Sequence, residues 1–261
     1  MAHHQHLREV ERPRHVGAVI LAAGHGERIG AGPKALLEVG GKPLLLHVLE
    51  SMGSNSSIES VVVTAPPSLV ADFRNLVAST DREVTVRVTP GGPTRQHSAR
   101  LGVEALPPEA DWVAITDVAR PFTPPGAVDA LLDELRGTPG SAGSSRPPCG
   151  IVPSLPLVDS LHLLDEDPFL GAPFDRALLR AAQTPQIFDR NCVSEAHAAA
   201  ARDRLAFTDD AGMIRHFGGT VTAGSGDASN FKITYERDLA LAEALYAHLS
   251  SAPPSGSSAH G

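Results

Sequence analysis

A short apolar run followed by a glycine-rich loop occupies residues 17–34, which read GAVILAAGHGERIGAGPK. The apolar residues 19–21 predict a buried strand of a parallel sheet, because the run is too short for a helix and is closed by glycine. The glycines of the loop let its backbone turn sharply and direct N–H groups at phosphate oxygens. Arg28 and Lys34 add two cations suited to a phosphate edge and to the charge that develops as a phosphoryl bond breaks. The stretch therefore predicts a phosphate-binding site at a strand end.

Two other kinds of glycine loop fit these residues less well. A dinucleotide-binding turn has the spacing GxGxxG and an acidic residue about twenty positions later. This loop reads GxGxxxG, and no acid closes an obvious second strand at that distance. A Walker loop requires Gly-Lys-Ser/Thr, whereas Lys34 here follows Pro33. An ordinary turn with solvated charges stays open from this stretch alone.

Helical and strand patterns alternate after the loop. Apolar residues at helical spacing predict helices over residues 43–52 and 69–77, and strands are predicted over 60–67 and 84–90. This alternation predicts an α/β fold with a Rossmann-like, mostly parallel central sheet and flanking helices. Loops after the strands then share one edge, where ligands bind in open sheets. Further along, the pattern predicts helices over 125–135 and 196–205, a helix that Thr208 caps and that runs through 213–217, and a closing amphipathic helix.

The two ends of the chain have no apolar pattern. Residues 1–15 and the Ser-, Pro- and Gly-rich residues 250–261 are therefore expected to be a disordered leader and tail. Residues 16–249 are expected to form a single domain, which is within the usual size for one α/β domain.

Two further segments are predicted to reach the same sheet edge. The segment GGPTRQHSARLG ends a strand at a glycine pair, so Gly92, Arg95 and Ser98 lie near the first loop if the strands are neighbours. A helix is predicted from Ser98 onward. Asp117 follows a buried strand at 112–115, and a carboxylate facing a phosphate chain there suits Mg²⁺. A helix-capping aspartate is the structural alternative for Asp117.

An apolar hairpin is predicted between residues 155 and 176. Apolar residues alternate over 158–163 and are broken by the turn-forming Asp-Glu-Asp-Pro, which is typical of a β-hairpin arm. A lone two-stranded projection is only marginally stable and usually pairs with something. The arm therefore predicts a homodimer, because a self-complementary patch closes around a twofold axis.

Composition excludes some classes of partner. The net charge of −8 argues against nucleic acid, whose phosphates are held by basic surfaces. No segment approaches the apolar length needed to span a bilayer. The two cysteines, Cys149 and Cys192, cannot build a disulfide framework and lack metal-site spacing, so buried or incidental thiols in a reducing cytoplasm are expected.

Six motifs in this order resemble one enzyme family. They read AAGHGERIGAGPK, GGPTRQHSA, TDVARP, TPQ, TDDA and NFKIT, and they span about 230 residues. The chain thereby resembles the 2-C-methyl-D-erythritol 4-phosphate cytidylyltransferases, a group of sugar- and polyol-phosphate nucleotidyltransferases. The resemblance implies transfer of the cytidylyl group of CTP to the polyol phosphate, with Mg²⁺ as cofactor and pyrophosphate as product. It also implies a role in isoprenoid precursor synthesis, and an arm that embraces a second subunit and completes its acceptor site.

The resemblance assigns a role to each motif residue. Catalytic cations are Arg28 and Lys34. Nucleotide contacts are assigned to Ala22, Ala23, Gly24, Gly26, Gly92, Arg95 and Ser98. Asp117 is assigned to metal binding. Binding of the acceptor is assigned to Asp117, Arg120, Ser160, Arg176, Asp209 and Lys232. Without the resemblance, Arg176 and Lys232 are read as solvated charges, and Asp209 as a partner of a helix dipole.

Several positions depart from the family pattern and leave alternatives open. Leu21 replaces a usual proline, and Pro93 has no N–H to donate to a base. Thr116, Val118, Ser160 and His162 differ near the acceptor side. The same chemistry on another acceptor, such as ribitol 5-phosphate or a phosphonate, is therefore an alternative. A non-catalytic nucleotide-binding regulatory protein is another, although retention of Arg28 and Lys34 argues against it.

Overall fold

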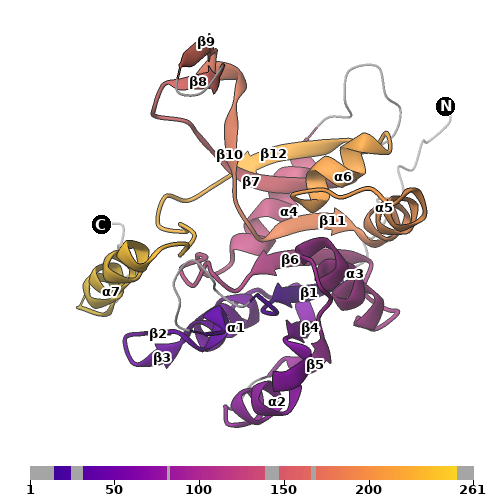
Figure 1. Ribbon diagram of the computed structural model, residues 1–261. Helices are drawn as coiled ribbons and strands as arrows, with labels where there is room; N and C mark the ends of the chain where they lie inside the picture. The colour runs from indigo at the N-terminus through magenta and orange to yellow at the C-terminus, as the bar shows by residue number, and fades with distance from the viewer. Residues whose placement is uncertain (1–14, 25–31, 81–82, 139–146, 166–168, 252–261) are drawn as a thin grey trace, which may run out of the picture.

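An eight-stranded sheet forms the centre of the computed structural model (Figure 1). The structure describes residues 15–24, 32–80, 83–138, 147–165 and 169–251. The strands of the sheet are β1 (Val16–Leu21), β4 (Ile58–Ala65), β5 (Thr85–Pro90), β6 (Trp112–Asp117), β7 (Gly150–Pro156), β10 (Arg180–Ala182), β11 (Gln186–Asp189) and β12 (Val221–Ser225).

The sheet is parallel in its first half and mixed in its second. Strands β6, β1, β4 and β5 lie side by side in that order and run parallel. Strand β11 joins this half to β7 and runs antiparallel to both β6 and β7. Strand β10 pairs antiparallel with the far end of β7, and β12 pairs parallel with β7. The expected Rossmann-like sheet with mostly parallel central strands is therefore confirmed.

Helices cover both faces of this sheet. One face carries α1 (Leu44–Gly53), α2 (Val70–Ala78) and α4 (Ala127–Gly137). The other carries α3 (Arg95–Ala105), α5 (Arg190–Asp203) and α6 (Asp210–His216). The C-terminal helix α7 (Glu236–Ser251) packs beside the small hairpin of β2 (Glu38–Val39) and β3 (Lys42–Pro43). None of the helices in these described ranges has the length and apolar character needed to cross a membrane.

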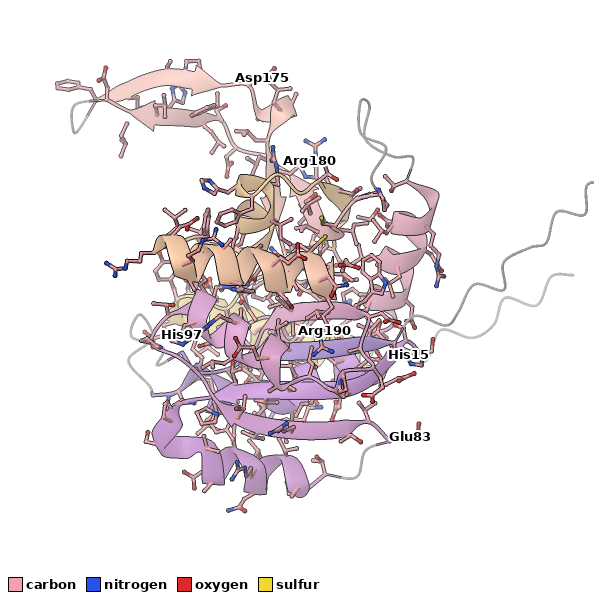
Figure 2. All side chains as sticks on the ribbon, turned by 90° about the vertical axis from the view of Figure 1, so that its right-hand side faces the viewer. His15, Glu83, His97, Asp175, Arg180 and Arg190 are labelled. Carbon is pink, nitrogen blue, oxygen red and sulfur yellow. The ribbon has the colours of Figure 1, made fainter. Side chains whose placement is uncertain are left out.

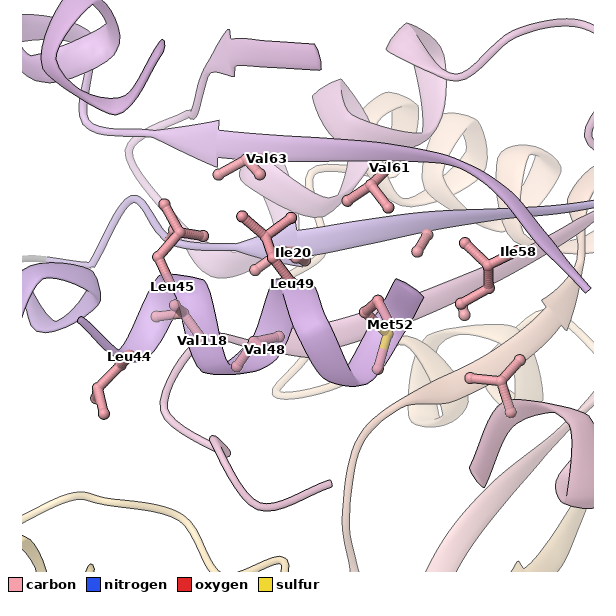
Figure 3. Close-up of a cluster of buried hydrophobic side chains, with 14 of the residues drawn as sticks. Ile20, Leu44, Leu45, Val48, Leu49, Met52, Ile58, Val61, Val63 and Val118 are labelled. Carbon is pink, nitrogen blue, oxygen red and sulfur yellow. The ribbon is translucent and has the colours of Figure 1, made fainter. Parts of the chain in front are cut away.

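Two hydrophobic cores follow from the alternation of side chains along the strands. On β1, Val16, Ala18 and Ile20 enter the core under α1, whereas Val19 and Leu21 enter the core under α3. Figure 3 shows the first core, in which one face of α1 packs against Ile20 and the strands beside it. Every residue of β1 is buried, as the apolar run in the sequence predicted.

Three helices begin at polar capping residues that the apolar pattern did not indicate. Helix α3 starts three residues earlier than predicted, because the Thr94 hydroxyl accepts the His97 N–H at 3.1 Å. Helix α5 starts at Arg190 and not at residue 196, because the Asp189 carboxylate accepts the Cys192 N–H at 2.9 Å. Helix α6 is capped by Asp209, which corrects the expectation that Thr208 caps it. Each cap satisfies a backbone donor that the first helical turn leaves free.

The predicted chain ends need small corrections. His15 belongs to the fold, since its ring lies 2.6 Å from Glu59 and its carbonyl accepts the N–H groups of Asp111 and Trp112. Helix α7 continues to Ser251, beyond the predicted domain end at 249. The rest of the expected leader and tail, residues 1–14 and 252–261, lies outside the described residues. The single-domain prediction stays a prediction.

The predicted arm is a two-stranded hairpin that stands away from the sheet (Figure 1). It consists of β8 (Leu161–Leu164) and β9 (Leu170–Phe174), which pair antiparallel. In Figure 2, Asp175 lies at the base of this projection and Arg180 lies where the chain rejoins the body. The arm and its base expose large apolar side chains: Val158, Leu163, Leu164, Phe169, Leu170, Phe174 and Leu178. This apolar surface is large for a projection that stays in water.

The core under α1 gives a direct test of the packing. Leu45 is fully buried on α1, whereas Leu241 on α7 is 56% exposed. We expect Leu45→Ala to lower the free energy of unfolding by about 2–5 kcal/mol, because it removes apolar burial and leaves a cavity. Leu241→Ala makes the same chemical change at the surface and should stay within about 0.5 kcal/mol of the parent. Urea unfolding followed by circular dichroism measures both, and equal losses would contradict the assigned core.

Candidate active site

A pocket opens at the carboxyl ends of β1 and β6, the edge at which the sequence placed a ligand. Its volume is about 450 Å³, which is within the usual range for small-molecule sites. The pocket is lined by Leu21, Ala23, Gly24, Lys34, Gly92, Pro93, Thr94, Arg95, Ser98, Asp117, Val118, Ala119 and Lys232. The structure therefore brings together residues from three predicted motifs and from the C-terminal NFKIT segment.

The Asp117 carboxylate lies among cations from two distant segments. Its Oδ2 is 2.6 Å from Lys232 Nζ, and its Oδ1 is 3.4 Å from Arg95 Nε. Burial would raise the pKa of Asp117, but the charges of Lys232 and Arg95 outweigh it and hold the pKa below its usual value. Asp117 is thus a carboxylate at neutral pH, and it is the last residue of β6 rather than one just past its end.

A threonine pair fixes the backbone around this carboxylate. Thr184 Oγ1 accepts the Asp117 N–H at 3.1 Å and lies 3.2 Å from Thr116 Oγ1. Both threonine side chains are buried. Thr116, which differs from the family pattern, therefore contacts Thr184 of the TPQ segment, and the two residues together hold the end of β6.

A second buried carboxylate, Asp210, holds the other end of Arg95. The Arg95 Nη1 is 2.8 Å from Asp210 Oδ2, and His197 Nε2 is 3.1 Å from Asp210 Oδ1. Burial raises the pKa of Asp210, but His197 and Arg95 together bring it below its usual value. The two carboxylates raise the pKa of Arg95 despite its burial. The arginine is therefore clamped between α6 and the end of β6.

The sequence did not identify Asp210 or His197 as part of this site. In TDDA the two aspartates are adjacent, and Asp209 was the one assigned to the acceptor. In the structure the Asp209 carboxylate accepts the Gly212 N–H at 2.8 Å as a helix cap, whereas Asp210 points to Arg95. The spacing of residues along α6 could have identified Asp210, because it lies on the buried side of this helix with Met213 and Ile214.

The C-terminal segment contributes Lys232 to the pocket and contacts the first loop. Ile233 is fully buried, and its N–H donates to the Ala119 carbonyl at 2.9 Å. The Ile233 carbonyl accepts Lys34 Nζ at 3.0 Å, which places Lys34 beside Lys232. This segment is irregular in the structure, so the reading of Lys232 as a solvated edge charge on a strand is wrong.

The glycine turn after β5 reaches the first loop even though β4 separates β1 from β5. At Gly91 an added Cβ would lie 2.5 Å from the Ala23 side chain, so only glycine permits this approach. The Gly92 N–H donates to Ser98 Oγ at 3.1 Å, and Ser98 Oγ lies 3.0 Å from the Thr94 carbonyl. The Ser98 hydroxyl thus shapes this turn from a buried position.

The remaining assigned residues are distributed as follows. Ala22 is buried and its N–H donates to the Thr64 carbonyl, while Gly24 is exposed at the pocket edge. Gly26 and Arg28 lie outside the described residues. Arg120 does not line the pocket; its Nη1 donates to the Asn230 carbonyl at 2.6 Å, and burial lowers its pKa.

Two assigned acceptor residues lie on the arm and not in the pocket. Ser160 and Arg176 are both exposed, and the Arg176 guanidinium donates to the Val158 carbonyl. Neither residue lines the pocket of its own chain. In the part of the chain that the structure describes, no three His, Cys, Asp or Glu side chains gather as metal ligands.

Comparisons with known proteins agree on one family. The family model described as 2-C-methyl-D-erythritol 4-phosphate cytidylyltransferase matches residues 16–248. A protein of that name from Streptomyces coelicolor is 40% identical over 90% of this chain and 86% of its own length. One from Deinococcus radiodurans is 40% identical over 89% of this chain and 90% of its own. The crystal structure of the Thermus thermophilus enzyme superposes with a TM-score of 0.69 at 34% identity, covering 88% of this chain and 98% of that one.

The Arg95–Asp210 pair predicts how stability depends on pH. Because the native pKa of Asp210 is lowered, its stabilising contribution is complete above the unfolded value near 3.8 and is lost as the pH falls below that value. We expect Asp210→Asn to cost about 1–3 kcal/mol at pH 7, since half-buried Arg95 and buried His197 lose a charged partner and Arg95 keeps only its 3.4 Å contact with Asp117. The difference in the free energy of unfolding between this variant and the parent should become smaller below pH 4.

Asp209→Asn is the matched control for this experiment. Asparagine caps helices as well as aspartate does, so the change should cost under about 0.5 kcal/mol. Urea unfolding at a series of pH values measures both variants. A difference between Asp210→Asn and the parent that is the same at pH 3 and pH 7 would contradict the role given to the Asp210 charge.

Proposed function

Since the chain belongs to the 2-C-methyl-D-erythritol 4-phosphate cytidylyltransferase family, we propose that it transfers the cytidylyl group of CTP to 2-C-methyl-D-erythritol 4-phosphate. The products are 4-diphosphocytidyl-2-C-methyl-D-erythritol and pyrophosphate, on the route to isoprenoid precursors. The observation that carries this proposal is the grouping of Lys34, Lys232 and Arg95 around Asp117 at the carboxyl edge of the sheet. Three cations beside one carboxylate leave a net positive pocket in a chain whose net charge is −8.

The reaction joins two anions, so the protein has to position them and offset their repulsion. An oxygen of the acceptor phosphate attacks the α-phosphorus of CTP, and the bond from that phosphorus to the β-phosphate bridging oxygen breaks in line. The electron pair leaves with pyrophosphate, and no protein group forms a covalent bond. Lys34 supplies a point charge near the developing negative charge, and Lys232 supplies one toward the acceptor. Arg28 belongs to this set by its motif.

Asp117 also suits the Mg²⁺ that the family resemblance implies. Magnesium in nucleotide sites uses one or two carboxylates and takes its other ligands from phosphates and water. One carboxylate at the pocket edge fits that donor set, and its low pKa keeps it charged. When bound, the ion would neutralise phosphate charge and orient the leaving group. Asp117 would then exchange part of its contact with Lys232 for the ion, which frees the lysine for the acceptor phosphate.

Base selection rests on the turn from Gly91 to Ser98. The internal hydrogen bond between Gly92 and Ser98 holds that turn in one shape. Pro93, Thr94 and Arg95 then border the pocket from a fixed backbone. A rigid site of hydrogen-bonding groups rejects a base that leaves those groups unpaired, which favours CTP over UTP.

The arm supports a homodimer with a shared acceptor site. Its exposed apolar side chains need a cover, and Arg176 and Ser160 lie on it away from the pocket of their own chain. A twofold-related copy provides the cover and brings Arg176 of each chain toward the other chain's pocket. We place this enzyme in the cytoplasm, which fits its two free thiols.

An acceptor screen tests the proposed reaction. Pyrophosphate release should require CTP and 2-C-methyl-D-erythritol 4-phosphate, and it should stop when EDTA removes divalent ions. Replacing CTP by UTP should lower kcat/KM by about 100-fold or more. Faster turnover with ribitol 5-phosphate or a phosphonate would assign the enzyme to another acceptor. Binding of CTP without turnover on any acceptor would support the regulatory alternative.

Lys34→Ala tests the transition-state charge. We expect kcat to fall by about two to three orders of magnitude, the usual cost of removing one stabilising group at the reacting phosphorus. Lys42→Ala is the control, because Lys42 Nζ binds Glu50 at 2.6 Å on the outer face of α1 and does not line the pocket. An unchanged kcat in Lys34→Ala, with unchanged melting, would remove Lys34 from the catalytic groups.

Deleting the arm tests the shared site. Pro156 and Arg180 are direct partners in the ladder between β7 and β10, so a short Gly-Ser turn can replace residues 157–179. The deleted form should be monomeric, and its KM for the acceptor should rise by about tenfold or more, with CTP affinity changed by less than about twofold. Arg176→Gln should stay dimeric and show the same selective loss. Light scattering and substrate titration measure these properties, and a monomeric full-length chain would contradict the shared site.

A further inference from the structure

Two cysteines far apart in sequence meet outside the active site. Cys149 directly precedes β7, Cys192 lies in the first turn of α5, and their Sγ atoms are 2.6 Å apart. Both are free thiols, and both are partly exposed rather than buried. Their partial exposure corrects the expectation of buried thiols.

The surrounding backbone holds both cysteines in place. The Cys149 N–H donates to the Thr220 carbonyl at 2.7 Å, and the Cys149 carbonyl accepts the Asp189 N–H at 2.8 Å. The Asp189 carboxylate in turn accepts the Cys192 N–H at 2.9 Å. One residue therefore binds both cysteines, so the sulfurs meet without any movement of a loop.

This pair lies at the opposite end of the sheet from the pocket. Strand β7 runs in the same direction as β6, because β11 is antiparallel to both. Gly150 pairs with Phe188, which pairs with Val113, so the sulfurs lie near the start of β6. Asp117 is at the other end of that strand. The thiols thus take no part in the proposed transfer reaction.

We propose that Cys149 and Cys192 form a reversible dithiol site that closes to an intramolecular disulfide when a small-molecule disulfide, such as glutathione disulfide, is present. Cys149 Sγ attacks one sulfur of glutathione disulfide, and one glutathione leaves as a thiol. Cys192 Sγ then loses its proton, attacks Cys149 Sγ in the mixed disulfide and releases the second glutathione. The protein loses two electrons and two protons, and the glutathione disulfide gains them.

The order of attack follows from the contact between the thiols. Cys192 Sγ is the donor toward Cys149 Sγ, and burial together with Cys149 raises the pKa of Cys192 to about 12. Cys192 therefore keeps its proton at neutral pH, which leaves Cys149 as the sulfur that attacks first. A metal site is disfavoured, since no third Cys, His, Asp or Glu ligand joins the pair among the described residues.

The bridge would close a loop that contains the whole arm. The cysteines are 43 positions apart, and the chain between them forms β7, β8, β9, β10 and β11. Closing a loop of this length restricts the unfolded chain and raises the stability of the folded one. Oxidation would thus link the two ends of the segment that carries the arm, at the end of β7 away from the arm, while the pocket keeps its own contacts.

Oxidation of the full-length chain with glutathione disulfide tests the proposal. We expect the loss of both titratable thiols, an intact mass lower by two hydrogens and a cross-linked peptide that joins the two cysteines. The Tm should rise by about 5–10 °C and return when dithiothreitol is added. Cytidylyl transfer by the reduced protein should be the same in the parent, Cys149→Ser and Cys192→Ser.

The serine variants separate this site from other thiol chemistry. Neither variant should show the rise in Tm, and Cys192→Ser should stop at a mixed disulfide with one glutathione. Three results would overturn the proposal: thiols that stay titratable in the oxidised parent, a stable mixed disulfide in the parent, or cross-links between two chains. A chain that proves inactive as a transferase can still be tested in this way, because mass and melting do not depend on turnover.

Discussion

The buried carboxylate of Asp117 connects three parts of the chain that are far apart in sequence. It ends β6, binds Lys232 of the C-terminal segment and lies beside Arg95 of α3, while Thr184 holds its backbone. A buried carboxylate that loses such partners has no water to replace them, so each partner has to stay in place. The same arrangement leaves more positive than negative charge in the pocket. The constraint that organises this end of the sheet therefore also prepares it for phosphate.

The fold could be predicted from the sequence where burial sets a repeating pattern. The continuous apolar run of β1 predicted a strand buried on both faces, and the apolar residues of α1, which repeat every three to four positions, predicted a helix; both elements formed. The starts of α3, α5 and α6 were wrong because the first turn of a helix is polar and depends on one cap each, at Thr94, Asp189 and Asp209. A capping side chain has no period, so a pattern of apolar residues does not locate it.

The site shows the same division between local and tertiary signals. Asp117 and the turn after β5 were predicted to meet the first loop because strand ends share an edge, and they do. Asp210 and His197 were missed, because their contact with Arg95 joins α6 and α5 to α3. Ser98 was assigned to the base by resemblance, and in the structure its hydroxyl binds the backbone of its own turn. Ser98 therefore lines the pocket and also shapes the turn that borders it.

The position of the arm is set by the sheet and not by its own residues. The chain leaves through β7 and returns through β10, and these two strands pair side by side from Pro156↔Arg180 to Ser154↔Ala182. Arg176 lies only four residues before β10, so the sheet determines where this arginine leaves the body of the protein. An arm rooted in this way presents its apolar side chains and its arginine in one orientation. A second copy can then be bound with little loss of conformational entropy, which is the condition for an acceptor site built from two chains.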